Sequence, residues 1–167
     1  MARHDVEFAE YFSARFDRAR RIAFALCGDW VEAEELAQEA FVRLYAHWTR
    51  IRPDTVDGYL RTVLTRLFLS RGRGQRGREH VVPEPPDLPQ ADRSGDADDR
   101  AAVVSALLQV PPRQRAVLVL RYALDLSVEQ VAQILRCSDG TVKSQAARGL
   151  RNFQNAYQAS TFEPHVS

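Results

Sequence analysis

The 167-residue chain carries 23 Lys and Arg against 22 Asp and Glu, a formal net charge of +1, and 45% of its residues are hydrophobic. This composition is typical of one ordinary globular domain or two very small ones, and it excludes a large enzyme or a disordered chain. The sequence has no apolar run near the ~18–20 residues of a membrane span, and its first ten residues are charged where a signal peptide is apolar. We therefore expect a cytoplasmic protein without a membrane partner.

Charge is unevenly distributed along the chain. Residues 1–78 carry 14 basic and 11 acidic side chains, and residues 101–167 carry seven and four, whereas the 22 residues between them carry two and seven. Residues 79–99 also hold four prolines and few large apolar groups, so this stretch cannot bury enough apolar surface to offset its ordering entropy. The sequence predicts the following division: a basic domain over 1–75, a flexible acidic linker over 76–99, a second basic domain over 100–158, and a tail over 159–167.

The first domain is predicted to contain three helices. Apolar residues recur at steps of three and four, and no run alternates as a half-buried strand does. We expect the first helix to begin after an N-cap at Asp5 and to end at Gly28, and the second to be capped by Asp29. The third is expected over about residues 57–70.

The second domain is also predicted to be helical and to end in a helix-turn-helix. Ser127 and Gln130 have the types and spacing of a capping box, a turn follows around Cys137, and the last helix begins near Asp139. In such modules the second helix enters the major groove of DNA. An ordinary amphipathic surface helix has the same periodicity. The capping box, the turn and the small polar residues at the start of the last helix nevertheless favour DNA binding. The candidate reading residues on the last helix are Asp139, Thr141, Lys143, Ser144, Gln145 and Arg148.

A basic run and an acidic helix face suggest two further surfaces in the first domain. Between residues 58 and 78 there is no acid, and six arginines there would bind phosphate in a salt-sensitive way, although a solvated, glycine-loosened tail is the alternative. Tyr59 could stack on unpaired bases. The arginines are Arg61, Arg66, Arg71, Arg73, Arg76 and Arg78. The second helix instead presents Glu32, Glu34, Glu35, Gln38 and Glu39, which disfavour nucleic acid and favour a basic protein partner, unless they form only a solvated face.

Signals of enzymatic chemistry are weak. The four histidines are scattered, and Cys27 and Cys137 have neither metal-ligand nor disulfide-framework spacing. No glycine-rich phosphate loop or nucleophile elbow is present. We therefore expect no catalytic residue, no metal and no cofactor.

Two sets of motifs resemble those of bacterial RNA polymerase sigma factors. Residues 29–45 and 58–65, with the arginine-rich stretch that follows, resemble the region-two domain. Residues 110–122, 126–132 and 140–144 resemble the region-four helix-turn-helix. The chain is as small as sigma factors of the extracytoplasmic-function type. The amino-acid sequences of its motifs are similar to those of the actinobacterial sigma-E-like subgroup.

The resemblance implies an all-α, two-domain initiation factor that binds core RNA polymerase and directs promoter recognition and melting. It implies docking on a coiled coil of the largest polymerase subunit through Glu35, Gln38, Glu39 and Phe41. It implies −10 contacts from Arg52, Tyr59, Arg61, Arg66, Arg71 and Arg73, and it adds Arg115 to the last-helix residues that would bind the −35 element. The β flap of the polymerase, promoter DNA and an anti-sigma factor are the implied partners, and the implied location is the nucleoid.

Two features of the sequence bear on promoter recognition. Arg66 stands where many relatives have Asn, and Gln145 replaces a frequent Arg. The predicted linker spans at most roughly 80 Å when extended, which permits two modules to lie two DNA turns, about 70 Å, apart.

Two other functions remain possible from the residues alone. One is a helix-turn-helix regulator that acts without polymerase docking, with the first domain sensing or dimerising. The other is a helical hydrolase or nuclease, which the missing acid, base and metal constellations disfavour.

Overall fold

A computed structural model describes residues 2–74 and 94–161 of the chain. These residues divide into two compact units, on either side of the boundary between positions 84 and 85. Within the described ranges every regular element is a helix, so the predicted all-α fold with two helical domains is confirmed. Most of the predicted linker, residues 76–93, lies outside the described residues.

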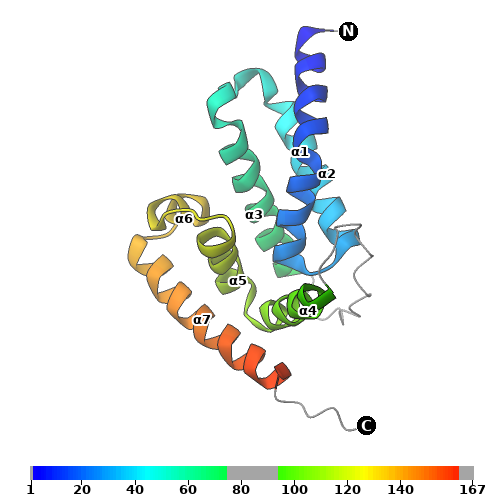
Figure 1. Ribbon diagram of the computed structural model, residues 1–167. Helices are drawn as coiled ribbons and strands as arrows, with labels where there is room; N and C mark the ends of the chain where they lie inside the picture. The colour runs from blue at the N-terminus through cyan, green and yellow to red at the C-terminus, as the bar shows by residue number, and fades with distance from the viewer. Residues whose placement is uncertain (1, 75–93, 162–167) are drawn as a thin grey trace. The chain divides into compact units, whose positions relative to one another are not determined.

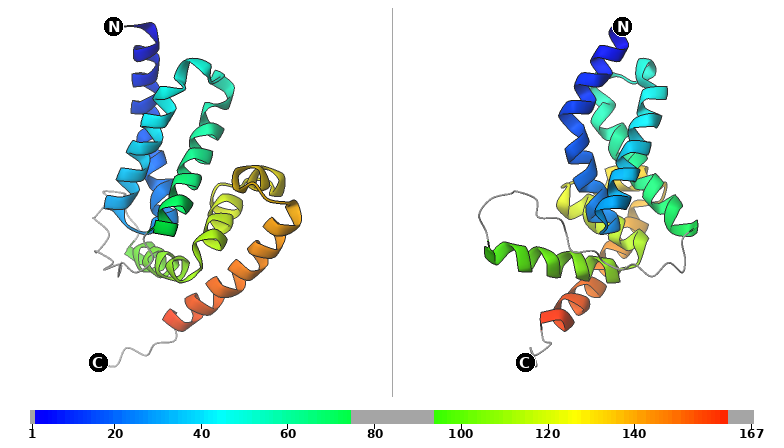
Figure 2. Two further views of the ribbon diagram at one scale, coloured as in Figure 1. Left: turned by 180° about the vertical axis from the view of Figure 1, so that it is seen from behind. Right: turned by 90° about the vertical axis from the view of Figure 1, so that its right-hand side faces the viewer.

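The first unit is a bundle of three helices that lie side by side (Figures 1 and 2). Its elements are α1 (Arg3–Cys27), α2 (Trp30–Ala46), the 3₁₀ turns η1 (Trp48–Arg50) and η2 (Pro53–Thr55), and α3 (Val56–Gly74). The helices pack because each carries an apolar stripe at helical spacing. Leu26 of α1, Leu36 and Leu44 of α2 and Leu64 of α3 are fully buried in this core.

The helix ends of the first unit follow the sequence with two exceptions. Gly28 ends α1 in the left-handed conformation (φ 73°), and the Asp29 carboxylate caps α2 by accepting from the Val31 N–H at 2.9 Å. The predicted N-cap at Asp5 is wrong, because α1 already begins at Arg3 and Asp5 lies in its first turn. The helix α3 continues past the predicted end near Ser70 to Gly74, which places Arg71 on the helix.

The second unit is built from four helices and one irregular turn. Its elements are α4 (Ser94–Gln109), α5 (Pro112–Leu118), the π-helical segment η3 (Val119–Ala123), α6 (Val128–Leu135) and α7 (Asp139–Thr161). The long helix α7 packs against α4, α5 and α6 (Figures 1 and 2). Val117, Leu120, Val131 and Val142 are fully buried between these helices.

One boundary of the predicted linker needs correction. The sequence assigns residues 94–99 to the linker, but α4 begins at Ser94. A serine and acidic residues favour a helix N-terminus, and the alanines that follow are strong helix formers, so local propensity extends α4 into the acidic stretch. The chain between α3 and α4 is therefore residues 75–93, which span at most about 65 Å.

Candidate nucleic-acid interface

The start of α7 is held in place by a capped turn. Ser127 and Gln130 form the predicted capping box at the start of α6, with the two hydrogen bonds at 3.1 and 2.8 Å. The helix α6 ends at Arg136 in the left-handed conformation (φ 55°). The Ser138 hydroxyl then accepts from the Thr141 N–H at 3.1 Å, so α7 begins at a fixed point. This arrangement of α6, turn and α7 confirms the predicted helix-turn-helix.

A glycine lets α7 lie close to α5. A Cβ added at Gly149 would lie 3.2 Å from Cγ of Leu118 and 3.4 Å from Cβ of Gln114. The next turn of the helix adds a hydrogen bond from the Asn152 amide to the Gln114 side chain at 2.7 Å. The close packing orients α7, so its outward residues point in defined directions.

The predicted reading residues of α7 differ in their exposure. Val142 is fully buried beneath them, whereas Lys143 and Arg148 are exposed and have no ion pair within residues 94–161. Asp139 and Ser144 are also exposed, and Thr141 and Gln145 are half-buried. The hydroxyls are engaged locally, since Thr141 bonds to Ser138 at 2.9 Å and Ser144 donates to the Thr141 carbonyl at 3.1 Å. The two cations and the Gln145 amide are therefore the groups best placed for DNA.

Arg151 is a further exposed cation of α7, outside the set predicted from the sequence. It is exposed on α7 one turn after Arg148, and in the described part of the chain it has no ion pair. The i, i+3 spacing of these arginines places them on one side of the helix. That spacing was visible in the sequence and could have identified Arg151.

The structure argues against a DNA contact by Arg115. This side chain is 7% exposed, and its guanidinium donates to the carbonyls of Leu107 (2.7 Å), Leu108 (3.1 Å) and Val110 (2.9 Å). These carbonyls lie at the C-terminal end of α4, where helical partners are lacking. Arg115 therefore stabilises the junction of α4 and α5, and its predicted place among the −35 contacts is corrected.

The acidic face of α2 is partly neutralised by the basic run. Glu35 and Gln38 are exposed, and Glu39 is half-buried. Arg71 reaches back from α3 to Glu39 at 2.6 Å and to Glu35 at 3.6 Å, and Arg43 pairs with Glu39 at 3.4 Å. The predicted docking face and the predicted DNA-binding run therefore share an ion-pair network.

Phe41 does not lie on that face. It is 2% exposed, and its ring packs against Phe8, Tyr11, Phe12 and Phe16 of α1 with centroid distances of 5.0 to 6.2 Å. Its predicted place in the docking surface is corrected, because this aromatic cluster joins α1 to α2. A position at i+6 from Glu35 lies about 120° away around a helix with 3.6 residues per turn, so Phe41 faces α1 while Glu35 faces solvent.

The predicted −10 residues lie along the η1–η2 loop and α3. Arg52 is exposed between the two 3₁₀ turns and pairs with Asp54 at 3.4 Å. Tyr59 is half-buried, with its ring 6.4 Å from that of His47. Arg61 and Arg66 are half-buried on α3. Arg73 is on α3, and its side chain lies outside the described part.

Metal and thiol chemistry find no support within the described residues. No group of three or more His, Cys, Asp or Glu side chains there could hold a metal ion. Burial raises the pKa of the Cys27 thiol to about 12, which keeps it protonated and unreactive at neutral pH. No helix among the described residues has the length and apolarity that crossing a bilayer requires.

Comparison with known proteins assigns both units. Residues 12–78 match the family described as Sigma-70 region 2, and residues 100–153 match Sigma-70, region 4. The RNA polymerase sigma-E factor of Streptomyces coelicolor is 36% identical over 87% of this chain and 82% of its own length. The ECF RNA polymerase sigma factor SigE of Mycolicibacterium smegmatis is 35% identical over 87% of this chain and 60% of its own length.

A solved structure has the same fold. The sigma factor RpoE of Bartonella quintana, determined in complex with the anti-sigma factor NepR, matches with a TM-score of 0.72 and 22% identity. The match covers 91% of this chain and 97% of that one.

Proposed function

Because this chain belongs to the sigma-70 family of RNA polymerase sigma factors, in its extracytoplasmic-function group, we propose how its units divide the work of initiation. The protein is a transcription initiation factor that acts with core RNA polymerase at promoter DNA. In our proposal, residues 1–75 dock on the polymerase and bind the −10 element, residues 100–158 bind the −35 element, residues 76–99 connect them, and 159–167 form a tail. The protein acts by binding alone, without catalysis, in the cytoplasm at the nucleoid.

The acidic face of α2 is our candidate for polymerase docking. Glu35 and Gln38 are exposed, and Glu39 can be reached beside them. Carboxylates steer and orient a basic partner, here a coiled coil of the largest polymerase subunit. Phe41 contributes by holding α2 against α1 rather than by touching the partner.

Arg71 links docking to DNA binding in this proposal. A basic polymerase segment that binds Glu35 and Glu39 competes with Arg71 for the same carboxylates. Once displaced, Arg71 is available for phosphate together with the rest of the basic run. Docking would therefore raise the cationic charge that α3 offers to the promoter.

The N-terminal half of α7 is our candidate for reading the −35 element. Lys143 and Arg148 can donate to guanine or phosphate, and the Gln145 amide can pair with adenine. Arg151 extends the same side of the helix toward the DNA backbone. Arg52, Tyr59, Arg61 and Arg66 remain the candidates for the −10 element, and the β flap and an anti-sigma factor remain proposed partners.

The observation that carries the proposal is that a region-2 unit and a region-4 unit occur in order on one chain. The test is run-off transcription with purified core polymerase on promoters selected from genomic DNA by the reconstituted holoenzyme. We expect transcripts that depend on this chain. A helix-turn-helix regulator would instead bind DNA alone and fail both to pull down core polymerase and to support initiation.

A further inference from the structure

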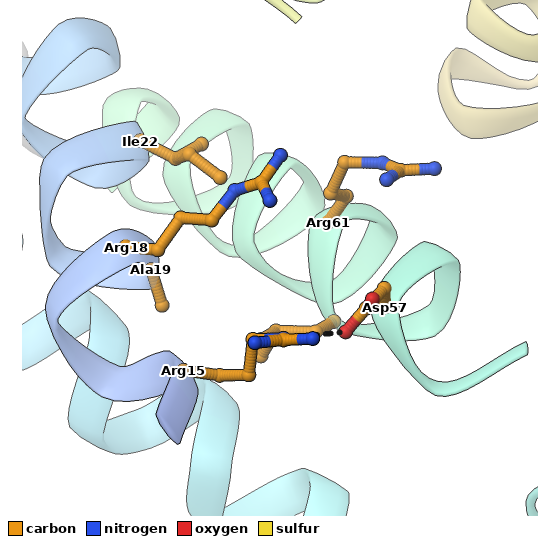
Figure 3. A pocket seen from close by; sticks show the side chains of 7 residues that line it. Arg15, Arg18, Ala19, Ile22, Asp57 and Arg61 are labelled. Atoms are coloured by element: carbon orange, nitrogen blue, oxygen red, sulfur yellow. Dashed lines mark hydrogen bonds and ion pairs between the residues drawn. The ribbon is translucent and has the colours of Figure 1, made fainter. Parts of the chain in front are cut away.

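A pocket between α1 and α3 gathers cationic side chains. Arg15 and Arg18 project from α1, and Arg61 and Asp57 project from α3 (Figure 3). The apolar part of the lining consists of Ala19, Ile22 and Leu60. Three guanidinium groups and one carboxylate leave the lining with an excess of two positive charges.

The carboxylate in the pocket, that of Asp57, already has hydrogen-bond partners within the first unit. Asp57 accepts from the Tyr11 hydroxyl at 2.6 Å and from Nε of Arg15 at 3.3 Å. The Tyr11 hydrogen bond, with smaller contributions from Arg15 and Arg18, lowers the pKa of Asp57 below its ordinary value, so Asp57 is ionised at neutral pH. It is hydrogen-bonded to Arg15, and no hydrogen bond or ion pair joins it to the other two arginines.

Among the described residues, Arg61 and Arg18 have no hydrogen-bond or ion-pair partner. The Nε–H of Arg61 is buried and has no hydrogen-bond partner in this part of the chain. Arg18 is exposed, and within residues 2–74 it forms no ion pair and no hydrogen bond. A buried donor without a partner costs about 1–3 kcal/mol, so the fold gains when an acceptor reaches it. Guanidinium groups donate in a fork that matches the oxygens of phosphate.

We propose that the α1–α3 pocket binds a phosphate group through Arg18 and Arg61, with Asp57 as the competing anion. Two guanidinium groups with several N–H donors suit the oxygens of a phosphate group better than the two oxygens of a carboxylate, which would duplicate Asp57. The phosphate can be a backbone phosphodiester of a DNA strand that follows α3, or a free phosphate or phosphorylated small molecule. The first source rests on the proposed function, whereas the pocket itself does not.

The first experiment observes Arg61 directly in the unaltered full-length protein. The Nε–Hε resonances of the arginines are followed by NMR during titration with sodium phosphate, with sodium chloride at matched ionic strength, and with a 12-nucleotide single-stranded DNA. We expect the Arg61 resonance to shift with phosphate or DNA and not with chloride. A shift with DNA alone identifies a strand phosphate, and a shift with inorganic phosphate alone identifies a free one.

The second experiment uses variants with opposite expected signs. Arg18→Ala and Arg61→Gln should weaken binding of whichever probe shifts Arg61 by about 10-fold, as for loss of one charge-assisted hydrogen bond. Asp57→Asn should strengthen binding, because it removes the competing anion and frees Arg15. Arg21→Ala is the matched control, since Arg21 lies on α1 outside the pocket and pairs with Asp17 at 2.9 Å. Thermal melts establish that each variant is folded.

Two results would overturn the proposal: an Arg61 resonance that no probe shifts, or an Arg21→Ala variant that binds as weakly as Arg18→Ala. Neither experiment contains polymerase. Failure of run-off transcription with the Arg61 response intact would therefore count against the proposed function and not against the pocket.

Discussion

The two units carry their charges in different ways. In the first unit, carboxylates of the same unit hold several of the cations, as in the pairs of Arg71 with Glu39 and Arg15 with Asp57. In the second unit, Lys143 and Arg148 on α7 have no ion pair among the described residues. Lys143 and Arg148 can therefore meet a duplex as they stand, whereas Arg15 and Arg71 of the first unit must exchange internal partners for external ones.

This difference has an energetic consequence. Exposed ion pairs contribute little to stability, at about 0–1 kcal/mol each, so an external partner can replace them at small cost. A buried guanidinium that satisfies backbone carbonyls, such as that of Arg115, cannot be exchanged in this way. The surface ion pairs of the first unit can therefore be exchanged for contacts with an external partner. The buried guanidinium of Arg115 in the second unit instead stabilises the fold.

The largest expected effect is the loss of polymerase binding when the charges on the acidic face of α2 are reversed. Glu35→Lys with Glu39→Lys should weaken binding to core polymerase by about 100-fold, roughly 3 kcal/mol, because attraction becomes repulsion. Glu10→Lys, an exposed acid on α1, serves as the control in a fluorescence-anisotropy binding assay. Unchanged affinity in the double variant would contradict the proposed docking role of α2.

The burial of Arg115 predicts a loss of stability rather than of DNA contact. Arg115→Ala should lower the free energy of unfolding by about 2–3 kcal/mol, because three carbonyls lose a charged donor. Urea unfolding measures this effect, and Arg148→Ala should change it by less than about 0.5 kcal/mol. If both variants are equally stable, the assignment of Arg115 to the α4–α5 junction fails.

Arg148→Ala should weaken −35-dependent initiation by about 1–3 kcal/mol if the side chain reads a base. Run-off assays on promoters that differ only in the −35 element measure the effect. Arg100→Ala removes an exposed charge from α4 and is the control. A loss that is equal on every promoter would assign Arg148 to phosphate.

The Arg71→Ala variant tests whether a cation that is paired within the unit competes with an external partner. It should increase affinity for core polymerase by a few-fold, because Glu35 loses its ion pair with Arg71 and Glu39 keeps only the one with Arg43. Arg43→Ala, which removes only the longer of the two ion pairs of Glu39, should have a smaller effect. A decrease in affinity on loss of Arg71 would mean that the ion pair shapes the docking face instead of competing for it.

The smallest expected effect concerns acid stability of the first unit. The pKa of Asp57 is lowered in the fold, chiefly by the Tyr11 hydrogen bond, so its stabilisation is present above the unfolded pKa and is lost as pH falls through the folded value. The stability advantage of the unaltered protein over Asp57→Asn should therefore shrink below about pH 4. Urea midpoints at pH 7 and pH 3 measure it, with Asp54→Asn as the control; a constant difference would contradict it.

The helices and their ends are more predictable from the sequence than the roles of single residues. The capping box at Ser127 and the end of α1 at Gly28 were predictable because they depend on neighbours along the chain. Phe41 and Arg115 were assigned to surfaces by resemblance, and the structure buries both. Their burial depends on α1 and on the end of α4, which no local pattern describes.

The sequence by itself determined an all-helical chain with two apolar cores, a capped helix-turn-helix and separate acidic and basic segments, because helical periodicity, capping and net charge are local properties. Only the tertiary structure decided which charged groups are free. The pairing of Arg71 with Glu39, 32 positions away, and of Arg15 with Asp57 arises where helices pack side by side. The packing distance between helices sets these contacts, and spacing along the chain does not.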